Sequence, residues 1–207
     1  MSQPNMWDTR FAAEEYVYGR EPNAFLKEHH LVFPKHARVL SLGEGEGRNA
    51  VFLARHGYDV TAIDASVEGM RKLSRLAAEG GVLVMQRQED VTQANLGQSR
   101  WDGIVSIFCH LPSADRPALY ARIREALKPG GIFLTEVFTP RQLGYTSGGP
   151  KDPDLLVERD ELVKAFEGAP DSGFEIVLAE EEIVTLDEGP LHQGLGSVVR
   201  FIARRKE

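Results

Sequence analysis

Three glycines separated by single residues have the type and spacing that most directly indicate chemistry in this sequence. Gly43, Gly45 and Gly47 follow the mostly apolar run 39–42 and precede a helix-like stretch. A buried strand that turns sharply into a helix needs glycine where φ is positive or where a ligand touches the backbone. Twenty-one residues after Gly43, Asp64 ends the next apolar run. An acid at the tip of a second strand can accept both hydroxyls of a ribose, so the pattern predicts a nucleoside cofactor.

The spacing of these glycines distinguishes between two kinds of nucleoside cofactor. A dinucleotide fold uses Gly-x-Gly-x-x-Gly, whose last glycine permits close helix–strand packing beside a pyrophosphate. Here the third glycine comes one residue early, and Arg48 occupies the position of that last glycine. The spacing favours a cofactor without a pyrophosphate, whose amino-acid portion lies across the loop. A glycine turn that exists only for steric reasons is the alternative.

The composition indicates a globular domain that does not bind nucleic acid. The 207 residues are 42% hydrophobic and 27% charged, with a formal net charge of −7 and no block of basic residues that could track phosphates. No apolar run reaches the roughly 18 residues of a membrane span, and the N-terminus lacks the layout of a signal peptide. The single cysteine, Cys109, cannot form an internal disulfide, so we expect a cytoplasmic location. No histidine or cysteine cluster has metal-ligand spacing, and we expect no metal.

The middle of the chain alternates short apolar runs with helix-period stretches, which predicts parallel βαβ units. Strands are expected at 38–42, 59–63, 82–86, 102–108 and 131–138, and helices at 48–56, 67–79, 115–127 and 158–167. A helical cap with a break at 19–22 is expected over 8–30, and an antiparallel pair over 174–186 and 195–203. We expect one domain, 1–207, that consists of a cap (1–36), a cofactor-binding core (37–138), a substrate loop (139–157) and a C-terminal helix and hairpin (158–207).

Five motifs in this order make the chain resemble the class I S-adenosylmethionine-dependent methyltransferases, in the branch of the TehB-like, tellurite-resistance enzymes. The motifs are Leu-Gly-Glu-Gly-Glu-Gly-Arg-Asn-Ala at 42–50, Leu-Ala-Arg-His-Gly-Tyr-Asp-Val-Thr-Ala-Ile-Asp at 53–64, Gln-Glu-Asp-Val at 88–91, Trp-Asp-Gly-Ile-Val-Ser at 101–106 and Leu-Lys-Pro-Gly-Gly at 127–131. The resemblance implies an α/β fold, with a Rossmann-like, doubly wound, mostly parallel seven-stranded sheet. It also implies an antiparallel C-terminal strand and an N-terminal helical cap.

The resemblance implies S-adenosylmethionine as the cofactor, with S-adenosylhomocysteine as the product. The glycines would admit the methionine part, Asp64 would accept from the ribose, Asp90 and Val91 would meet the adenine, and Ala65 and Phe108 would flank it or line the methionine channel. The expected cofactor-binding residues are Gly43, Glu44, Gly45, Gly47, Arg48, Asn49, Asp64, Ala65, Asp90, Val91 and Phe108. Two alternatives stay open, because Asp64 could be a helix N-cap and Asp90 a plain turn residue.

The chain departs from the family pattern two residues before the first glycine. The family usually has an acid there, whereas this chain has Ser41. The cofactor's ammonium group then lacks its usual nearby anion. We expect Glu44, inside the loop, to replace that acid, and the alternative is that Glu44 faces solvent.

The acceptor site is expected among side chains around the sulfonium. Residues expected to line it are Trp7, Arg10, Tyr16, Tyr18 and Tyr145, although the aromatic residues of the cap could serve packing alone. His110, at the end of a predicted parallel strand, is either a general base or a hydrogen-bonded histidine that starts the following helix. The TehB-like resemblance implies that His192 and Arg200 also line the site. Together with His110 they are the expected catalytic residues, and the alternative for Arg200 is an ion pair with a surface acid. The branch tends to place a second basic residue beside this histidine, whereas this chain has Gln193.

We interpret the chain as a methyltransferase that acts on a small, soft or anionic acceptor, such as a thiol or a selenium or tellurium species, by in-line displacement. Positioning alone can supply about 7–11 kcal/mol of such a barrier, so a catalytic nucleophile is not required. The alternatives are a protein side-chain methyltransferase, a nicotinamide-dependent oxidoreductase and a cofactor-binding module without catalysis. The expected partner is a small molecule, with no nucleic acid and no membrane, and the sequence leaves monomer and homodimer open.

Overall fold

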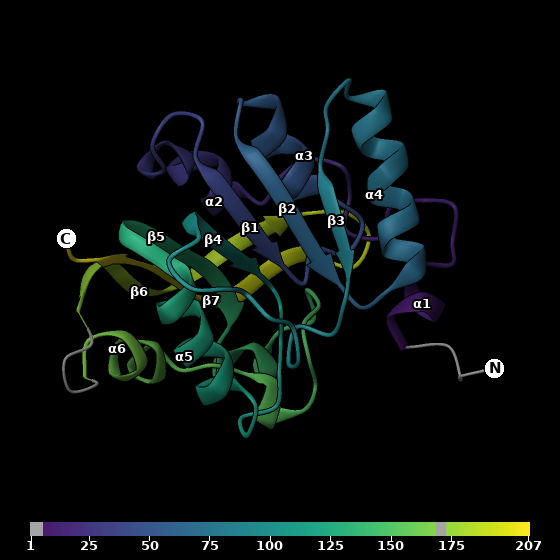
Figure 1. Ribbon diagram of the computed structural model, residues 1–207. Helices are drawn as coiled ribbons and strands as arrows, with labels where there is room; N and C mark the ends of the chain where they lie inside the picture. The colour runs from purple at the N-terminus through teal and green to yellow at the C-terminus, as the bar shows by residue number, and fades with distance from the viewer. Residues whose placement is uncertain (1–5, 169–172) are drawn as a thin grey trace.

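The computed structural model, which describes residues 6–168 and 173–207, is built on one seven-stranded sheet in the order β3-β2-β1-β4-β5-β7-β6 (Figure 1). The first five strands are parallel, and β7 runs antiparallel to both β5 and β6. The strands are β1 (Arg38–Leu42), β2 (Asp59–Asp64), β3 (Met85–Gln88), β4 (Trp101–Ile107), β5 (Leu127–Phe138), β6 (Phe174–Asp187) and β7 (Gln193–Arg205). The predicted doubly wound sheet with an antiparallel C-terminal strand is confirmed.

Helices cover both faces of this sheet, with α2, α3 and α4 on one side and α5 and α6 on the other (Figure 1). The helices are α1 (Met6–Phe11), α2 (Ala24–His29), α3 (Arg48–Arg55), α4 (Val67–Glu79), α5 (Arg116–Ala126) and α6 (Arg159–Phe166), with short 3₁₀ turns η1 (His30–Val32), η2 (Pro140–Gly144) and η3 (Pro153–Leu155). Two large hydrophobic clusters fill the two interfaces between sheet and helices. Within the described ranges, the structure has no helix with the length and hydrophobicity of a membrane span.

Local sequence explains where the core elements begin and end. Strand β1 is buried along nearly its whole length because parallel strands are covered on both faces. Helix α4 begins at Ser66, whose hydroxyl accepts the Gly69 N–H at 3.0 Å. Helix α5 ends at Ala126, just before the Lys-Pro-Gly-Gly segment, as its stop residues predicted. These ends place the carboxyl termini of β1, β2 and β4 at one edge of the sheet.

The predicted helical cap is wrong in its middle. Residues 12–23 are not helical, and only α1 and α2 flank them. The carbonyl oxygens of Glu14 and Glu15 accept from Arg75 at 3.2 Å and from Lys72 at 2.6 Å, both on α4. Because α4 binds these carbonyls, they are not available for a helical ladder.

The third strand lies later than its apolar residues predicted. It spans 85–88 instead of 82–86, because its pairing with β2 runs from Thr61–Met85 to Asp64–Gln88. This edge strand has one neighbour, and Leu83, which the prediction placed inside it, is 93% exposed. The fifth strand also begins earlier than predicted, at Leu127, which pairs with Trp101.

The tip of the β6–β7 hairpin packs against the N-terminal segment. Gly19 and Gly189 both have positive φ (72° and 78°). A Cβ at Gly189 would collide with the backbone of Tyr18 and Gly19, so this approach requires glycine. The Leu191 N–H also donates to the Val17 carbonyl at 3.3 Å. The segment before α2 and the tip of the β6–β7 hairpin therefore lie against each other.

Candidate active site

The glycine loop lies between β1 and α3, and all three of its glycines have left-handed φ: 61° at Gly43, 63° at Gly45 and 99° at Gly47. A Cβ at Gly43 would lie 2.5 Å from the Cys109 sulfur, and one at Gly47 would lie 2.6 Å from Leu73 Cγ. Both backbone conformation and close packing therefore require glycine here. The loop is pressed against the end of β4 on one side and against α4 on the other.

Asp64 lies at the carboxyl end of β2 and fixes this loop. One carboxylate oxygen accepts the Gly45 N–H at 2.8 Å and the other accepts the Ser66 N–H at 2.8 Å. Ser66 is the N-cap of α4, so the alternative that Asp64 itself is the helix N-cap does not hold. Burial raises the pKa of Asp64. Each oxygen keeps capacity for a further donor, such as a ribose hydroxyl, and Ala65 beside it is half-buried.

Glu44 is buried and points back toward the start of α3. Its Oε1 accepts the N–H groups of Asn49 at 3.1 Å and Ala50 at 2.9 Å, and its Oε2 accepts the Ser41 hydroxyl. Burial raises the pKa of Glu44 to about 7, although Ser41, the helix amides and Arg48 oppose the rise. The alternative that Glu44 faces solvent is wrong. The carboxylate lies against the residue that occupies the family's usual acid position.

Arg48 and Asn49 bind protein groups instead of projecting into the loop. Arg48 forms a buried ion pair with Glu188 of the hairpin tip at 2.6 Å. The Asn49 side chain accepts the Asn23 N–H at 2.9 Å. Glu188 Oε1 also accepts the Asn23 side-chain amide at 2.9 Å. Arg48 and Asn49, which were predicted to bind the cofactor, thus belong to a network of polar contacts that connects the N-terminal segment to the hairpin.

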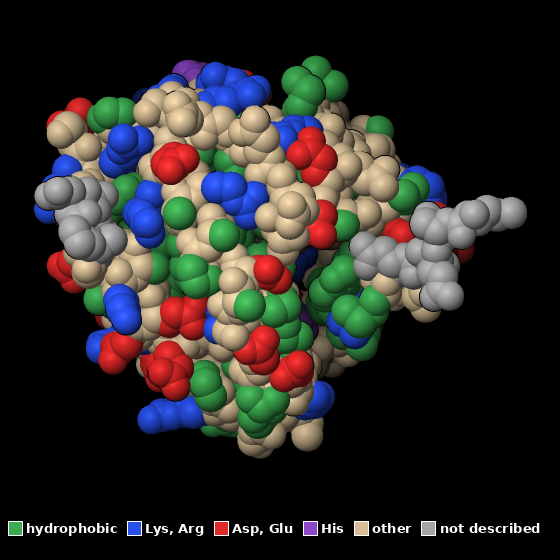
Figure 2. All heavy atoms as spheres, turned by 60° about the horizontal axis from the view of Figure 1, so that its bottom comes forward, with side chains coloured by type: hydrophobic (Ala, Val, Ile, Leu, Met, Phe, Trp, Pro, Cys, Tyr) green, Lys and Arg blue, Asp and Glu red, His purple; other side chains and the backbone are tan. Residues whose placement is uncertain are grey.

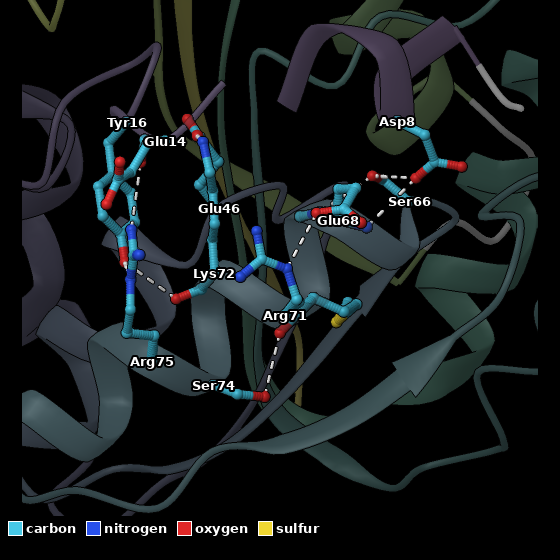
Figure 3. Close-up of polar contacts among 12 residues, drawn as sticks. Asp8, Glu14, Tyr16, Glu46, Ser66, Glu68, Arg71, Lys72, Ser74 and Arg75 are labelled. Carbon is cyan, nitrogen blue, oxygen red and sulfur yellow. Dashed lines mark hydrogen bonds and ion pairs between the residues drawn. The ribbon is translucent and has the colours of Figure 1, made fainter. Parts of the chain in front are cut away.

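The segment before α2 docks on α4 through buried and exposed polar contacts (Figure 3). Lys72 forms an ion pair with Glu46 of the glycine loop at 2.7 Å, and both side chains are nearly inaccessible to solvent. Tyr16 donates to the Lys72 carbonyl at 3.1 Å and accepts from Arg75 at 3.3 Å. The prediction that Tyr16 lines the acceptor site is therefore wrong, since its ring and hydroxyl bind α4.

Helix α1 lies over the glycine loop and the start of α4. The Asp8 carboxylate accepts the Ser66 hydroxyl at 2.6 Å and the Glu68 N–H at 3.3 Å (Figure 3). The Phe11 ring is buried, and a Cβ at Gly45 would lie 3.2 Å from it. Helix α1 thus covers the loop that the sequence assigns to the cofactor.

Asp90 and Val91 follow β3, one strand further along the same edge. Asp90 is exposed, and its Oδ1 accepts both the N–H and the hydroxyl of Thr92 at 2.8 and 2.7 Å. This is the geometry of a plain turn residue, which was the alternative for Asp90. The other carboxylate oxygen, Oδ2, has no hydrogen bond among the described contacts. Val91 is buried in the core. The adenine role of these two residues stays a prediction.

Two histidines and two phenylalanines gather where β4 and β5 end. The Phe108 and Phe138 rings stack 4.6 Å apart, and His192 lies 4.8 Å from Phe108 and 5.4 Å from Phe138. His110 stacks on Phe138 at 5.6 Å. Phe108 has φ of +50°, a strained conformation of the kind that clusters at functional sites. The structure thus brings His110, His192 and Phe108 together, and their roles at the site stay predictions.

The remaining predicted lining residues divide between this cluster and its rim. Tyr18 packs on His192 at 4.6 Å and accepts from Arg10 at 2.9 Å through its hydroxyl. Arg10 is exposed and lies over the Trp7 ring at 4.9 Å. Tyr145 follows η2, where its N–H donates to the Gln142 carbonyl at 2.9 Å. Its ring makes no aromatic contact among the residues that the structure describes.

Arg200 does not belong to the histidine cluster. Its guanidinium binds Glu136 at 2.5 Å and Glu182 at 2.7 Å, and it lies over the Phe25 ring at 5.3 Å. Burial raises the pKa of Glu136, but Arg200 counteracts this by favouring the carboxylate. The catalytic role predicted for Arg200 is wrong, because both sides of its guanidinium are occupied by carboxylates.

Sequence reasoning missed several residues that build this region. Phe138 could have been found from its place at the carboxyl end of a predicted strand. Glu188 and Asn23 carry no local signal, since a turn glutamate and an asparagine N-cap are common at surfaces. Burial by itself raises the pKa of Glu188, but His192 and Arg48 have the larger opposite effect and lower this pKa to about 2.

The residues at this edge fit S-adenosylmethionine. The left-handed glycines form a cradle that a Cβ would fill, and Asp64 retains acceptor capacity beside it. When the bottom of Figure 1 is turned forward, the surface shows a narrow hollow with hydrophobic and acidic side chains at its rim (Figure 2). Among residues 6–168 and 173–207, no group of three or more histidine, cysteine or acidic side chains is placed to hold a metal ion.

Part of the chain matches known proteins. Residues 39–131 match the family described as a methyltransferase domain. TehB of Haemophilus influenzae, named as a probable S-adenosyl-L-methionine-dependent methyltransferase, is 31% identical over 99 residues, which are 47% of this chain and 34% of TehB. This chain therefore spans about a third of that relative's length.

Solved structures share the fold over most of the chain. A protein described for the conversion of a disulfide bond into a thioacetal group during echinomycin biosynthesis superposes with a TM-score of 0.75 at 18% identity, covering 97% of this chain and 90% of that one. The crystal structure of Haemophilus influenzae TehB superposes with a TM-score of 0.69 at 21% identity, covering 88% of this chain and 61% of that one.

In sheet order, glycine loop and family match, the chain is similar to the class I S-adenosylmethionine-dependent methyltransferases. S-adenosylmethionine is the cofactor of these enzymes. The chain is also similar to TehB in sequence over residues of the core and in fold over most of its length.

Proposed function

We propose that this chain transfers the methyl group of S-adenosylmethionine to a small acceptor by in-line displacement. The observation that carries the proposal is the Asp64 carboxylate, which accepts the Gly45 N–H at 2.8 Å within a loop of left-handed glycines. This contact sets a ribose-binding acid beside backbone that has no side chain to exclude a ligand. Arg48, where a dinucleotide fold needs glycine, is fully engaged with Glu188 and argues against a nicotinamide cofactor.

In this proposal, the residues of the chain bind the cofactor and orient it. When bound, S-adenosylmethionine supplies an electrophilic methyl group on a sulfonium. Asp64 holds the ribose, Glu44 neutralises the ammonium and the N–H groups of the glycine loop meet the carboxylate. The cap and hairpin, joined by the Arg48–Glu188 ion pair, exclude water above the reacting atoms. Such positioning can supply about 7–11 kcal/mol of the barrier.

The acceptor that we propose is a small soft nucleophile, such as a thiol or a selenium or tellurium species. The likeness to TehB supports this class, and with it a role in tellurite resistance in the cytoplasm. The packing of loop 146–150 supports a small acceptor over a protein side chain. A Cβ at Gly148 would lie 2.7 Å from His192, and one at Gly149 would lie 2.7 Å from Phe138, so this loop covers the histidine cluster.

Titration calorimetry with S-adenosylmethionine, S-adenosylhomocysteine and NADH, side by side, tests the proposal. We expect S-adenosylhomocysteine to bind and NADH to give no heat. Methyl transfer is then followed as S-adenosylhomocysteine formation with thiols, selenite and tellurite as acceptors. Binding of NADH alone would refute the cofactor assignment, while cofactor binding with no transfer to any acceptor would favour a binding module.

A further inference from the structure

One nitrogen of His110 is buried without a hydrogen-bond partner. Its Nδ1 lies 3.0 Å from the Leu155 carbonyl of η3. A carbonyl only accepts, so Nδ1 carries the hydrogen and Nε2 holds a free lone pair. Nε2 is buried and finds no partner in the described structure. Leaving a buried acceptor without a donor is unfavourable, so a ligand that donates to Nε2 is the simplest reason for this arrangement.

His110 lies beside the loop assigned to the cofactor. The neighbouring residue, Cys109, contacts Gly43 so closely that a Cβ there would lie 2.5 Å from its sulfur. On the other side of the cluster, His192 packs on Tyr18 at 4.6 Å, and the Tyr18 N–H donates to Glu46 of the same loop at 3.3 Å. A group that contacts Nε2 of His110 therefore lies near the methionine part of a bound cofactor.

The cluster offers aromatic surface and no unpaired buried cation. Arg48 is paired with Glu188, and Arg200 is paired with two glutamates. Arg116, whose charge acts on His110, binds both oxygens of Glu161 at 2.7 and 2.9 Å. Arg10 is exposed at the rim. An oxyanion would lose its hydration here without a countercharge, whereas a neutral aromatic molecule could pack against the half-buried Phe108 ring.

We propose that the acceptor is a neutral aryl thiol or phenol that packs beside Phe108 and donates its S–H or O–H to Nε2 of His110. This rests on the proposed methyl transfer to a small acceptor, and it replaces the selenium and tellurium species considered above with a neutral aromatic acceptor. As transfer proceeds, the acceptor's sulfur or oxygen bonds to the methyl carbon, the C–S bond breaks with its electron pair on sulfur, and the acceptor's proton passes to Nε2. His110 is then a catalytic base whose tautomer the Leu155 carbonyl fixes.

The electrostatics around His110 narrow the acceptor further. Burial lowers the pKa of His110 to about 4, and His192 and Arg116 lower it as well, while the Leu155 carbonyl opposes them. The ring is therefore neutral, and Nε2 is available at physiological pH. A base this weak assists only acceptors whose own proton is acidic, which selects thiols and phenols over alcohols.

The test uses thiophenols and phenols of graded acidity, with selenite and tellurite as anionic comparisons. The variants are His110→Gln and, as a matched control, His56→Gln, an exposed histidine whose Nδ1 lies 2.8 Å from the Phe52 carbonyl. We expect His110→Gln to lower kcat by about 10²–10⁴-fold for the least acidic acceptors. The loss should shrink toward none for acceptors that are already ionised at the assay pH. S-adenosylhomocysteine affinity should be unchanged in both variants.

A second readout needs no turnover and no variant. In ¹⁵N NMR of the wild-type protein, adding a phenol without cofactor should shift the Nε2 resonance of His110 and leave Nδ1 in place. A resonance that does not move, a loss of kcat that is equal across the series, or turnover confined to selenite and tellurite would each overturn this proposal. Failure of the wild type to bind S-adenosylhomocysteine would instead overturn the proposed function itself.

Discussion

Replacing Glu44 by glutamine tests how this chain compensates for Ser41. The substitution removes a buried charge while keeping the local shape, because the remaining oxygen can still accept the amides of Asn49 and Ala50 at 3.1 and 2.9 Å. The new amide N–H can donate to the Ser41 hydroxyl oxygen, which reverses the direction of the hydrogen bond that Ser41 donates to Glu44. A loss of affinity would therefore report the missing charge and not a damaged loop.

The expected loss follows from the bond that a charged acceptor makes with the cofactor's ammonium. Such bonds contribute about 1.5–3 kcal/mol, so Glu44→Gln should weaken S-adenosylhomocysteine binding by roughly 10- to 150-fold. Methylthioadenosine has the same nucleoside but no amino-acid part, and its affinity should stay within about twofold of the wild-type value. Titration calorimetry with both ligands measures the difference, with the exposed Glu28→Gln as control.

The same glutamate predicts a dependence on pH. Its pKa rises from 4.5 to about 7 on folding, so the native state holds the proton more tightly than the unfolded state. The stability from this group is complete below pH 4.5 and is lost as pH rises through 7, a total of about 3 kcal/mol. Glu44→Gln should lack this decline in denaturant unfolding at pH 5 and 8.

Ligand binding should show the opposite trend with pH. The cofactor's ammonium favours ionised Glu44, so wild-type affinity for S-adenosylhomocysteine should increase between pH 6 and 8, with release of a proton. The doubly substituted Ser41→Asp/Glu44→Gln protein restores the family's usual acid and should recover most of the affinity. If Glu44→Gln lowers the affinities for S-adenosylhomocysteine and methylthioadenosine equally, or changes neither, the assignment of Glu44 to the ammonium is refuted.

Three further substitutions test the loop and its support. Asp64→Asn should weaken methylthioadenosine and S-adenosylhomocysteine alike, by at least about tenfold in calorimetry, because the ribose contact is common to both; selective loss of one ligand would contradict this. Gly47→Ala combines a φ of 99° with a Cβ 2.6 Å from Leu73 and should cost roughly 2–5 kcal/mol in denaturant unfolding, so a neutral effect would count against the loop geometry. Lys72→Met leaves Glu46 buried without its cation and should cost about 3–5 kcal/mol, and adding Glu46→Gln should recover part of that loss in the same assay.

Strands and helices of the parallel core could be predicted because each one depends mainly on its own residues. The run 38–42 is a strand as predicted, and the helix over 67–79 begins at its serine N-cap. The cap could not be predicted in the same way. Residues 12–23 have helix-forming composition, yet α4 binds the carbonyl oxygens of Glu14 and Glu15. A tertiary contact outweighed local propensity there.

The sequence by itself determined the cofactor class, because glycine spacing and the acid after the second strand are fixed by backbone geometry within a few residues. Only the tertiary structure decided which charged side chains are free. The sequence predicted that Arg48 binds the cofactor and that Arg200 lines the acceptor site, whereas the fold pairs each with carboxylates from other segments. It also left Nε2 of His110 without a partner. Pairing of charges depends on which elements meet in space, and this information is absent from local spacing.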